Sequence, residues 1–257
     1  MFTKEHDSDF EKVISLLEGD GDMLYFLSYC RKRIDGLRKE ALSDLDKFID
    51  SFSNRDFERR KRFTKIILDS ADSSCDSPRT MSHNLNERII KPTLDEWAKT
   101  ERANFLPFYW KAKYFHDHEA LEYAVKAFPN EQKPLVLSIE RDIWYLYYAT
   151  HHLPEGYIGY VDEDLPIVEE VEKRIVRVEN EATREELNAD FQFYKELILN
   201  YLISGGSHPR WRFGEDPILL ICVLPARARN PVLVTGKAPR RKRVIGSYVT
   251  GILSQIE

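Results

Sequence analysis

Residues 105–160 read FLPFYWKAKYFHDHEALEYAVKAFPNEQKPLVLSIERDIWYLYYATHHLPEGYIGY. Rings and aliphatic side chains recur there at helical spacing, which is typical of packed helices. Prolines divide the stretch, because proline lacks a backbone N–H donor and ends or restarts a helix. The expected helices span residues 107–115, 118–128 and 132–152. Since the connections are short, we expect neighbouring helices to pack antiparallel as hairpins.

The helix expected over residues 132–152 is the most apolar in the chain. Its apolar residues cover more than one face, so we expect it to lie at the centre of the core. Aromatic stripes of this kind usually form core, with tyrosines anchored through their hydroxyls. We therefore expect Trp144 to be buried, and Tyr147, Tyr148 and Tyr157 to reach the surface.

The first part of the chain carries further apolar stripes of helical period. One predicts a short helix from Ser8 to Leu17, and the next predicts a longer helix over residues 22–49. Gly36 is a weak point inside that longer helix, costing roughly 1 kcal/mol relative to alanine. A third helix is expected over residues 57–68, and a later stripe over 164–204 predicts either one helix or two broken near Asn180.

Two segments divide the expected helices. Residues 70–86 are rich in Ser, Asp and Asn, and predict a loop that could subdivide the helical domain. Residues 207–257 carry nine Lys/Arg against three Asp/Glu and contain β-branched runs that predict short strands. We therefore expect a mainly α-helical domain over residues 1–206 and a basic C-terminal appendage over residues 207–257.

One passage resembles the second half of a tetratricopeptide repeat. It reads WKAKYFHDHEALEYAVKAFPN over residues 110–130, with an aromatic helix, a short turn, and then Ala120 and Ala127 seven residues apart. The resemblance implies antiparallel helical hairpins. It also implies a surface that receives a peptide of a partner protein.

The adjacent pair His116-Asp117 permits a second interpretation. It resembles the motif of helical metal-dependent phosphohydrolases, in which histidines and aspartates hold a divalent ion that activates water. That resemblance implies His83, His116 and Asp117 as ligands, with a later acid such as Asp142 or Asp190. The other interpretation is that His116-Asp117 is a polar turn between two helices, with Asp117 or His118 near the helix cap.

The histidines at the end of the apolar helix also have two interpretations. His151 and His152 are adjacent, and one could enter a binding site lined by Tyr147, Tyr148 and Tyr157. The alternative is that they satisfy free carbonyls at the helix end, where a cation is worth about 0.3 to 1 kcal/mol. These five residues are our candidate partner-binding site.

The basic segment contains a run of four cations: Arg240, Arg241, Lys242 and Arg243. Such a run can neutralise the phosphates of a nucleic acid regardless of base sequence. It can equally form a solvated turn or contact the acidic part of the same chain. Nucleic-acid binding is therefore an alternative to protein binding.

The composition sets the class of protein. The 257 residues are 32% charged and include only three separated cysteines, which indicates a reducing cytoplasm. We expect no signal peptide and no membrane contact. Phosphate-loop, dinucleotide, nucleophile-elbow and zinc-protease motifs do not occur, so we expect no cofactor. The sequence favours a non-catalytic helical protein–protein interaction module, with the hydrolase and nucleic-acid interpretations as alternatives.

Overall fold

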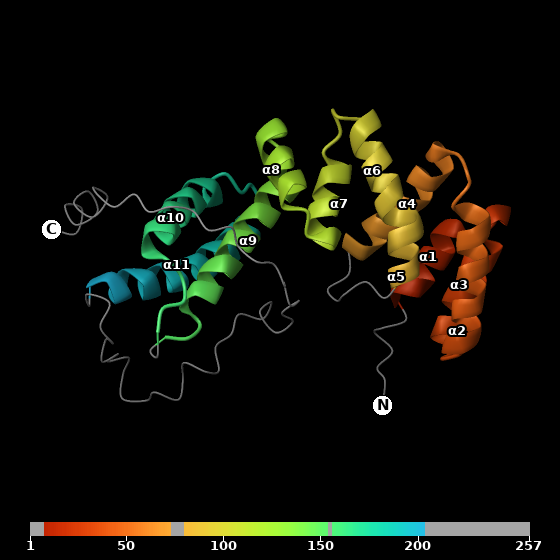
Figure 1. The fold of residues 1–257 in the computed structure, drawn as a ribbon, viewed down its shortest axis with the longest axis horizontal. Coiled ribbons are helices and arrows are strands. Elements are labelled where there is room, and N and C mark those ends of the chain that lie inside the picture. Colours follow the sequence, from red (N-terminus) through yellow and green to blue (C-terminus); the bar gives the residue numbers. More distant parts are fainter. Residues whose placement is uncertain (1–7, 73–79, 154–155, 204–257) are drawn as a thin grey trace. The chain divides into compact units, whose positions relative to one another are not determined.

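The computed structural model describes residues 8–72, 80–153 and 156–203, and their regular structure is helical throughout (Figure 1). The main helices are α1 (Ser8–Leu17), α2 (Leu24–Ile34), α3 (Arg38–Phe52), α4 (Phe57–Asp72), α6 (Lys91–Thr100), α7 (Leu106–Phe115), α8 (His118–Ala127), α9 (Gln132–Thr150), α10 (Val161–Ile175) and α11 (Glu181–Ile203). The short ones are the 3-10 turn η2 (Gly21–Met23), α5 (His83–Leu85) and the π-helical turn η3 (Asn86–Ile90). A mainly α-helical fold is thereby confirmed. The expected C-terminal strands lie outside the described residues.

The long helix expected over residues 22–49 is in fact two helices, α2 and α3. Gly36 adopts a positive φ of 77°, which helical backbone cannot accommodate. Leu37 N–H donates to the carbonyl of Lys32 at 2.8 Å, and Gly36 N–H donates to that of Arg33 at 3.2 Å. This pair of bonds is the Schellman arrangement that ends a helix. The glycine is therefore a helix stop, and α2 turns back to pack on α3.

The largest hydrophobic core lies in the first half of the chain, so the prediction that it centres on residues 132–152 is wrong. Phe26, Phe48, Phe52 and Phe63 form a cluster from α2, α3 and α4, with neighbouring ring centroids 4.8 to 5.2 Å apart. All four rings are at most 1% exposed. Within residues 105–160, Tyr109 and Trp110 belong to this core.

A single carboxylate joins three helices next to that core. Asp72, the last residue of α4, accepts hydrogen bonds from residues of α7 and α9. The donors are Tyr109 (3.5 Å), Trp110 (3.3 Å), Lys113 (2.7 Å), Tyr114 (2.8 Å) and Lys133 (3.0 Å). Burial alone would raise the pKa of Asp72. The hydrogen bonds from Lys113 and Tyr114 outweigh burial, so the pKa is lowered. The contact therefore holds the end of α4 against α7 and α9.

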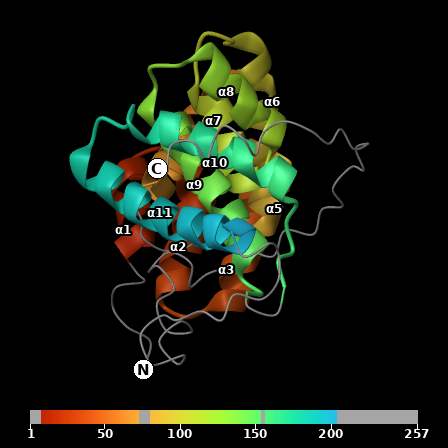
Figure 2. The same cartoon turned by 90° about the vertical axis from the view of Figure 1, so that its left-hand side faces the viewer.

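Within residues 105–160, where hairpins were expected, α7 packs on α8, and α8 packs on α9. The apolar stripe over residues 164–204 forms two helices, α10 and α11. The side-chain oxygen of Asn180 accepts from Thr183 N–H at 2.9 Å, so α11 begins at Glu181. Figure 2 shows α10 and α11, which contact each other, lying against α9.

Part of the loop expected over residues 70–86 is helical, because α4 continues to Asp72 and α5 begins at His83. Residues 73–79 lie outside the described part of the chain. In the part that is described, no helix combines the length and the apolar character needed to cross a membrane.

Candidate functional site

The C-terminal half of α9 carries a row of exposed rings. Trp144 stacks on Tyr148 with centroids 6.0 Å apart, and Tyr148 lies 5.0 Å from the His151 ring. His151 in turn lies 5.6 Å from Tyr147 and 4.2 Å from His152. Four of the five predicted partner-binding residues are thus brought together. Trp144 lies beside these four, and we call Trp144, Tyr147, Tyr148, His151 and His152 together the aromatic surface.

Helical spacing explains why these rings share one face. Positions 144, 148 and 151 are separated by four and three residues, and so lie above one another on a helix. The opposite face of α9 carries the buried residues Ile139, Ile143, Leu146 and Ala149. The other rings of the aromatic surface are consequently left exposed, while Tyr147 is half-buried.

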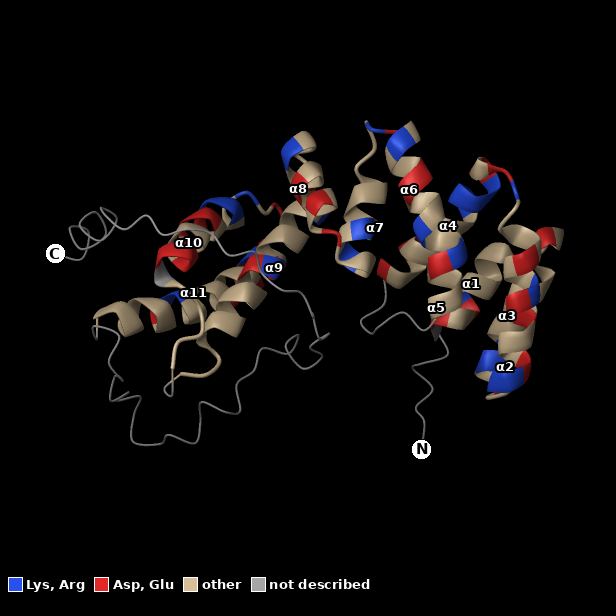
Figure 3. Ribbon diagram, viewed as in Figure 1, with Lys and Arg blue, Asp and Glu red and all other residues tan. Residues whose placement is uncertain are grey.

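Trp144 is 37% exposed and Tyr148 is 50% exposed, so the prediction that Trp144 is buried is wrong. The second half of α9 is apolar on every face, and periodicity alone could not tell which face would be covered. One sequence signal does mark the site. No Lys, Arg, Asp or Glu follows Asp142 in α9, and Figure 3 shows this half of the helix free of charge.

One ring of the aromatic surface packs against α11 through edge-on contacts. Tyr147 packs against Tyr194 at 5.9 Å, and Tyr194 against Phe193 at 5.2 Å. Phe193 is 41% exposed. Tyr194 is buried, so these contacts pack the side of the aromatic surface against α11.

His151 also has the helix-end role that the sequence suggested. Its Nδ1 lies 2.6 Å from the carbonyl oxygen of Tyr148, so the ring donates a hydrogen bond within the last turn of α9. The side chain remains exposed while making this bond. The bond fixes the ring against Tyr148, and thereby holds the exposed row in place.

Tyr157, the fifth predicted residue, lies in a separate contact. Its hydroxyl donates to the Asp164 carboxylate, and its ring stacks on Tyr201 at 4.9 Å. Burial is the main cause that raises the pKa of Tyr157, and the adjacent Asp164 adds to it. Through these contacts, Tyr157 holds the segment between α9 and α10 against α10 and α11.

The residues proposed as metal ligands lie at the ends of helices. Asp117 is the N-cap of α8 and accepts from Ala120 N–H at 2.9 Å. Its other oxygen pairs with Lys111 at 3.1 Å. His116 takes a left-handed conformation (φ 55°) at the end of α7, while His83 opens α5. The polar-turn interpretation of His116-Asp117 is confirmed.

The set His83, His116 and Asp117 does not assemble. Within residues 8–72, 80–153 and 156–203, no three His, Cys, Asp or Glu side chains converge closely enough to hold a metal ion. Asp142, one of the suggested later acids, pairs with Arg174. The structure therefore supplies no geometry for the hydrolase interpretation.

The basic run Arg240, Arg241, Lys242 and Arg243 lies outside the described residues, so polyanion binding stays a prediction from the sequence.

The described residues thus define a class, a mainly α-helical protein with an exposed aromatic surface on α9. No model of a known protein family matches the chain, and comparisons with curated proteins and with solved structures found no similar protein.

Proposed function

We propose that this chain binds another protein through the aromatic surface. The observation that carries the proposal is the row of exposed rings on a charge-free half of α9. Tryptophan and tyrosine are the residues that most often dominate binding energy at protein interfaces, and charged residues are depleted at interface centres. Contiguous exposed apolar areas of this kind mark interaction sites.

Two features support a peptide segment as the bound element. The passage over residues 110–130 resembles part of a tetratricopeptide repeat, and such repeats present helical hairpins to partner peptides. The α7–α8 hairpin precedes α9 in the chain, and α8 packs against α9. We place the activity in the cytoplasm, in keeping with the few separated cysteines. The division into a helical domain over residues 1–206 and a basic appendage over 207–257 is part of the same proposal.

The experiment is site-specific photo-crosslinking in the native cell. A photoreactive phenylalanine analogue replaces Tyr148 in one variant and Tyr25 in a matched control. Tyr25 is 48% exposed, close to the 50% of Tyr148, but it lies on α2. The proposal predicts a reproducible crosslinked protein from position 148 that is absent from position 25. Equal crosslinking from both positions, or none from 148, contradicts it.

A further inference from the structure

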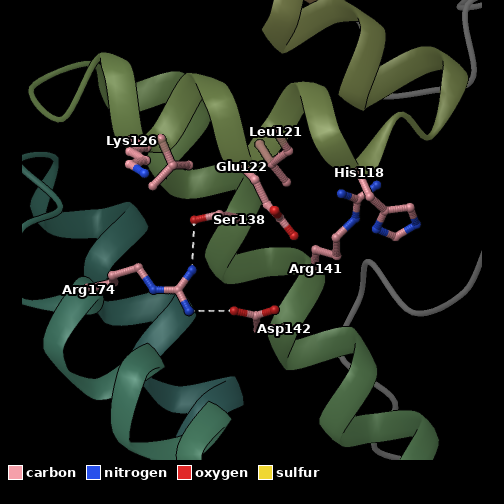
Figure 4. A pocket seen from close by; sticks show the side chains of 9 residues that line it. His118, Leu121, Glu122, Lys126, Ser138, Arg141, Asp142 and Arg174 are labelled. Carbon is pink, nitrogen blue, oxygen red and sulfur yellow. Dashed lines mark hydrogen bonds and ion pairs between the residues drawn. The ribbon is translucent and has the colours of Figure 1, made fainter. Parts of the chain in front are cut away.

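A cavity of about 390 Å³ lies between α8, α9 and α10 (Figure 4). At roughly 30 Å³ per water in the liquid, it has room for a small organic group. Leu121 and Val125 of α8 form an apolar wall. The polar residues of α9 and Arg174 of α10 form a polar wall, and α8 adds the polar side chains of His118, Glu122 and Lys126 beside its apolar pair.

One cation of the polar wall is already neutralised. Arg174 pairs with Asp142 at 2.5 Å and donates to the Ser138 hydroxyl oxygen at 3.1 Å. Ser138 donates its own hydrogen to the Leu135 carbonyl at 2.7 Å. Burial raises the pKa of Asp142, while Arg174 opposes that rise. These three side chains satisfy one another and have little left to offer a ligand.

Arg141 is the exception. It is half-buried beside the cavity, and no acid of the described residues forms an ion pair or hydrogen bond with its guanidinium. None of the nearby acids forms an ion pair with Arg141. Asp142 is held by Arg174, Asp117 by Lys111, and Glu122 lines the cavity beyond ion-pair distance. Burial lowers the pKa of Arg141, but arginine stays charged at any physiological pH. Asp142, Asp117 and Glu122 all attract this charge, but none of them contacts the guanidinium directly, so Arg141 has room for a further counter-ion.

We propose that this cavity binds a carboxylate group on a short aliphatic stem, with Arg141 as its cationic partner. The planar guanidinium fork matches a carboxylate through two parallel hydrogen bonds. The stem would lie along Leu121 and Val125. Because the acids Glu122 and Asp142 also line the cavity, a monoanion suits the site better than a doubly charged phosphate.

His118 fits the same ligand. Figure 4 shows its imidazole next to the Arg141 side chain. Burial is the main cause that lowers the pKa of His118, and the Arg141 charge adds to it. The lowered pKa favours the neutral ring, which offers a hydrogen-bonding group without adding charge.

The carboxylate has two possible sources, a free aliphatic acid or an acidic side chain of a bound protein. The second source rests on the proposed function. Arg141 precedes Trp144 by three residues and Tyr148 by seven, which places all three on one side of α9. An acidic residue of a partner lying on the aromatic surface could therefore reach the cavity.

The test is NMR titration of the full ¹⁵N-labelled chain with butyrate, following the Arg141 Nε–Hε signal. We expect a saturable shift with a dissociation constant on the order of 1 mM, as befits a ligand of this size. Arg141→Gln should weaken binding roughly tenfold or more, and Arg141→Lys should weaken it less, because it keeps the charge and loses the fork. Inorganic phosphate should bind more weakly than butyrate.

Lys126→Gln is the matched control, because Lys126 lines the same cavity but is exposed. It should change the affinity by about twofold or less. The absence of a saturable shift, or equal weakening by Arg141→Gln and Lys126→Gln, would overturn the proposal, provided that both variants keep the amide spectrum of the folded protein.

A second titration separates the two sources. N-acetylglutamate α-amide carries the same carboxylate between two peptide groups. If it binds as well as butyrate, the cavity accepts an acidic side chain of a polypeptide; if butyrate alone binds, the ligand is a free acid. The double variant Trp144→Ala/Tyr148→Ala should keep butyrate binding, so failure of the aromatic surface and failure of the cavity give different results.

Discussion

Gly159 is the residue whose replacement the structure resists most directly. A Cβ at this position would lie 2.2 Å from the Asp164 Oδ2 and 2.8 Å from the Ala149 Cβ. Such contacts force the connection between α9 and α10 to move. The absence of a side chain at Gly159 is what allows the turn to close over Asp164.

Gly159→Ala should therefore destabilise the protein by about 2 kcal/mol, the usual cost of overpacking. Gly156→Ala is the matched control in the same connection, since nothing lies within 4 Å of its added Cβ. Urea denaturation of the two variants measures the difference. Equal stability of the two would show that the turn yields without cost.

Asp164 gives a pH-dependent prediction. Its side chain is fully buried, and burial raises the pKa of its carboxyl despite the hydrogen bond from Tyr157. The folded state therefore favours the protonated acid. The contribution of Asp164 to stability is fully present below its ordinary pKa near 3.8. It is lost as the pH rises through the higher pKa of the folded state.

Asp164→Asn removes this titration and keeps the side chain's shape. Denaturation at about pH 4 and pH 7 should show wild type losing stability relative to the variant as the pH rises. A difference that is independent of pH, or one that favours wild type at pH 7, would contradict the assignment.

At the scale of elements, Asp72 is the contact that ties the end of α4 to α7 and α9. Asp72→Asn leaves Lys113 and Lys133 without their anion, and should cost about 2 kcal/mol at pH 7. Since the folded pKa is lowered, the wild-type advantage exists above the ordinary value of 3.8 and fades as the pH falls through the lower folded value.

Asp69→Asn is the control for this prediction. Asp69 lies one turn earlier on α4, and its side chain is 42% exposed in a pair with Lys65. It should change stability by less than about 0.5 kcal/mol. Thermal or urea unfolding of both variants across pH 3 to 7 gives the comparison, and similar losses from the two would refute the role of Asp72.

Helix positions were the part of the fold most open to prediction from sequence. The helices around Pro107 and Pro134 begin and end within two residues of the expected limits, because proline acts on the local backbone. The break at Gly36 was missed, since a glycine inside an apolar stripe is compatible with both a weak helix and a helix stop. The positive φ of Gly36 identifies it as a helix stop.

The contacts between helices were much less predictable. Asp72 meets donors 37 to 61 residues away, and no local pattern records such a pairing. The core rings of Phe26, Phe48 and Phe63 are likewise far apart in the sequence. The higher density of aromatic residues in 105–160 led to the prediction that the core lies there. For the candidate site, the tyrosines and histidines of α9 were predicted, but Trp144 and the unpaired Arg141 required the packing of neighbouring helices.

At the scale of the whole molecule, charge is distributed unevenly along the chain. Residues 207–257 carry a formal net charge of +6, whereas the entire chain has a net charge of −5. A basic segment attracts polyanions, and this uneven charge is the basis of the alternative proposal of polyanion binding.

Replacing Arg240, Arg241, Lys242 and Arg243 with serine should shorten retention on heparin, because salt-sensitive binding scales with the number of cations. Replacing the arginines of this run with lysine is the matched control and should preserve retention. Retention that survives the serine replacement would assign heparin binding to another part of the chain.

The central claim is that exposed rings on α9 bind a protein, and affinity for the crosslinked partner tests it most directly. Trp144→Ala should raise the dissociation constant roughly thirtyfold, the effect of losing about 2 kcal/mol at an interface hot spot. Tyr25→Ala, which removes an exposed ring from α2, should change it by about twofold or less. Equal affinities for the two variants would contradict the account.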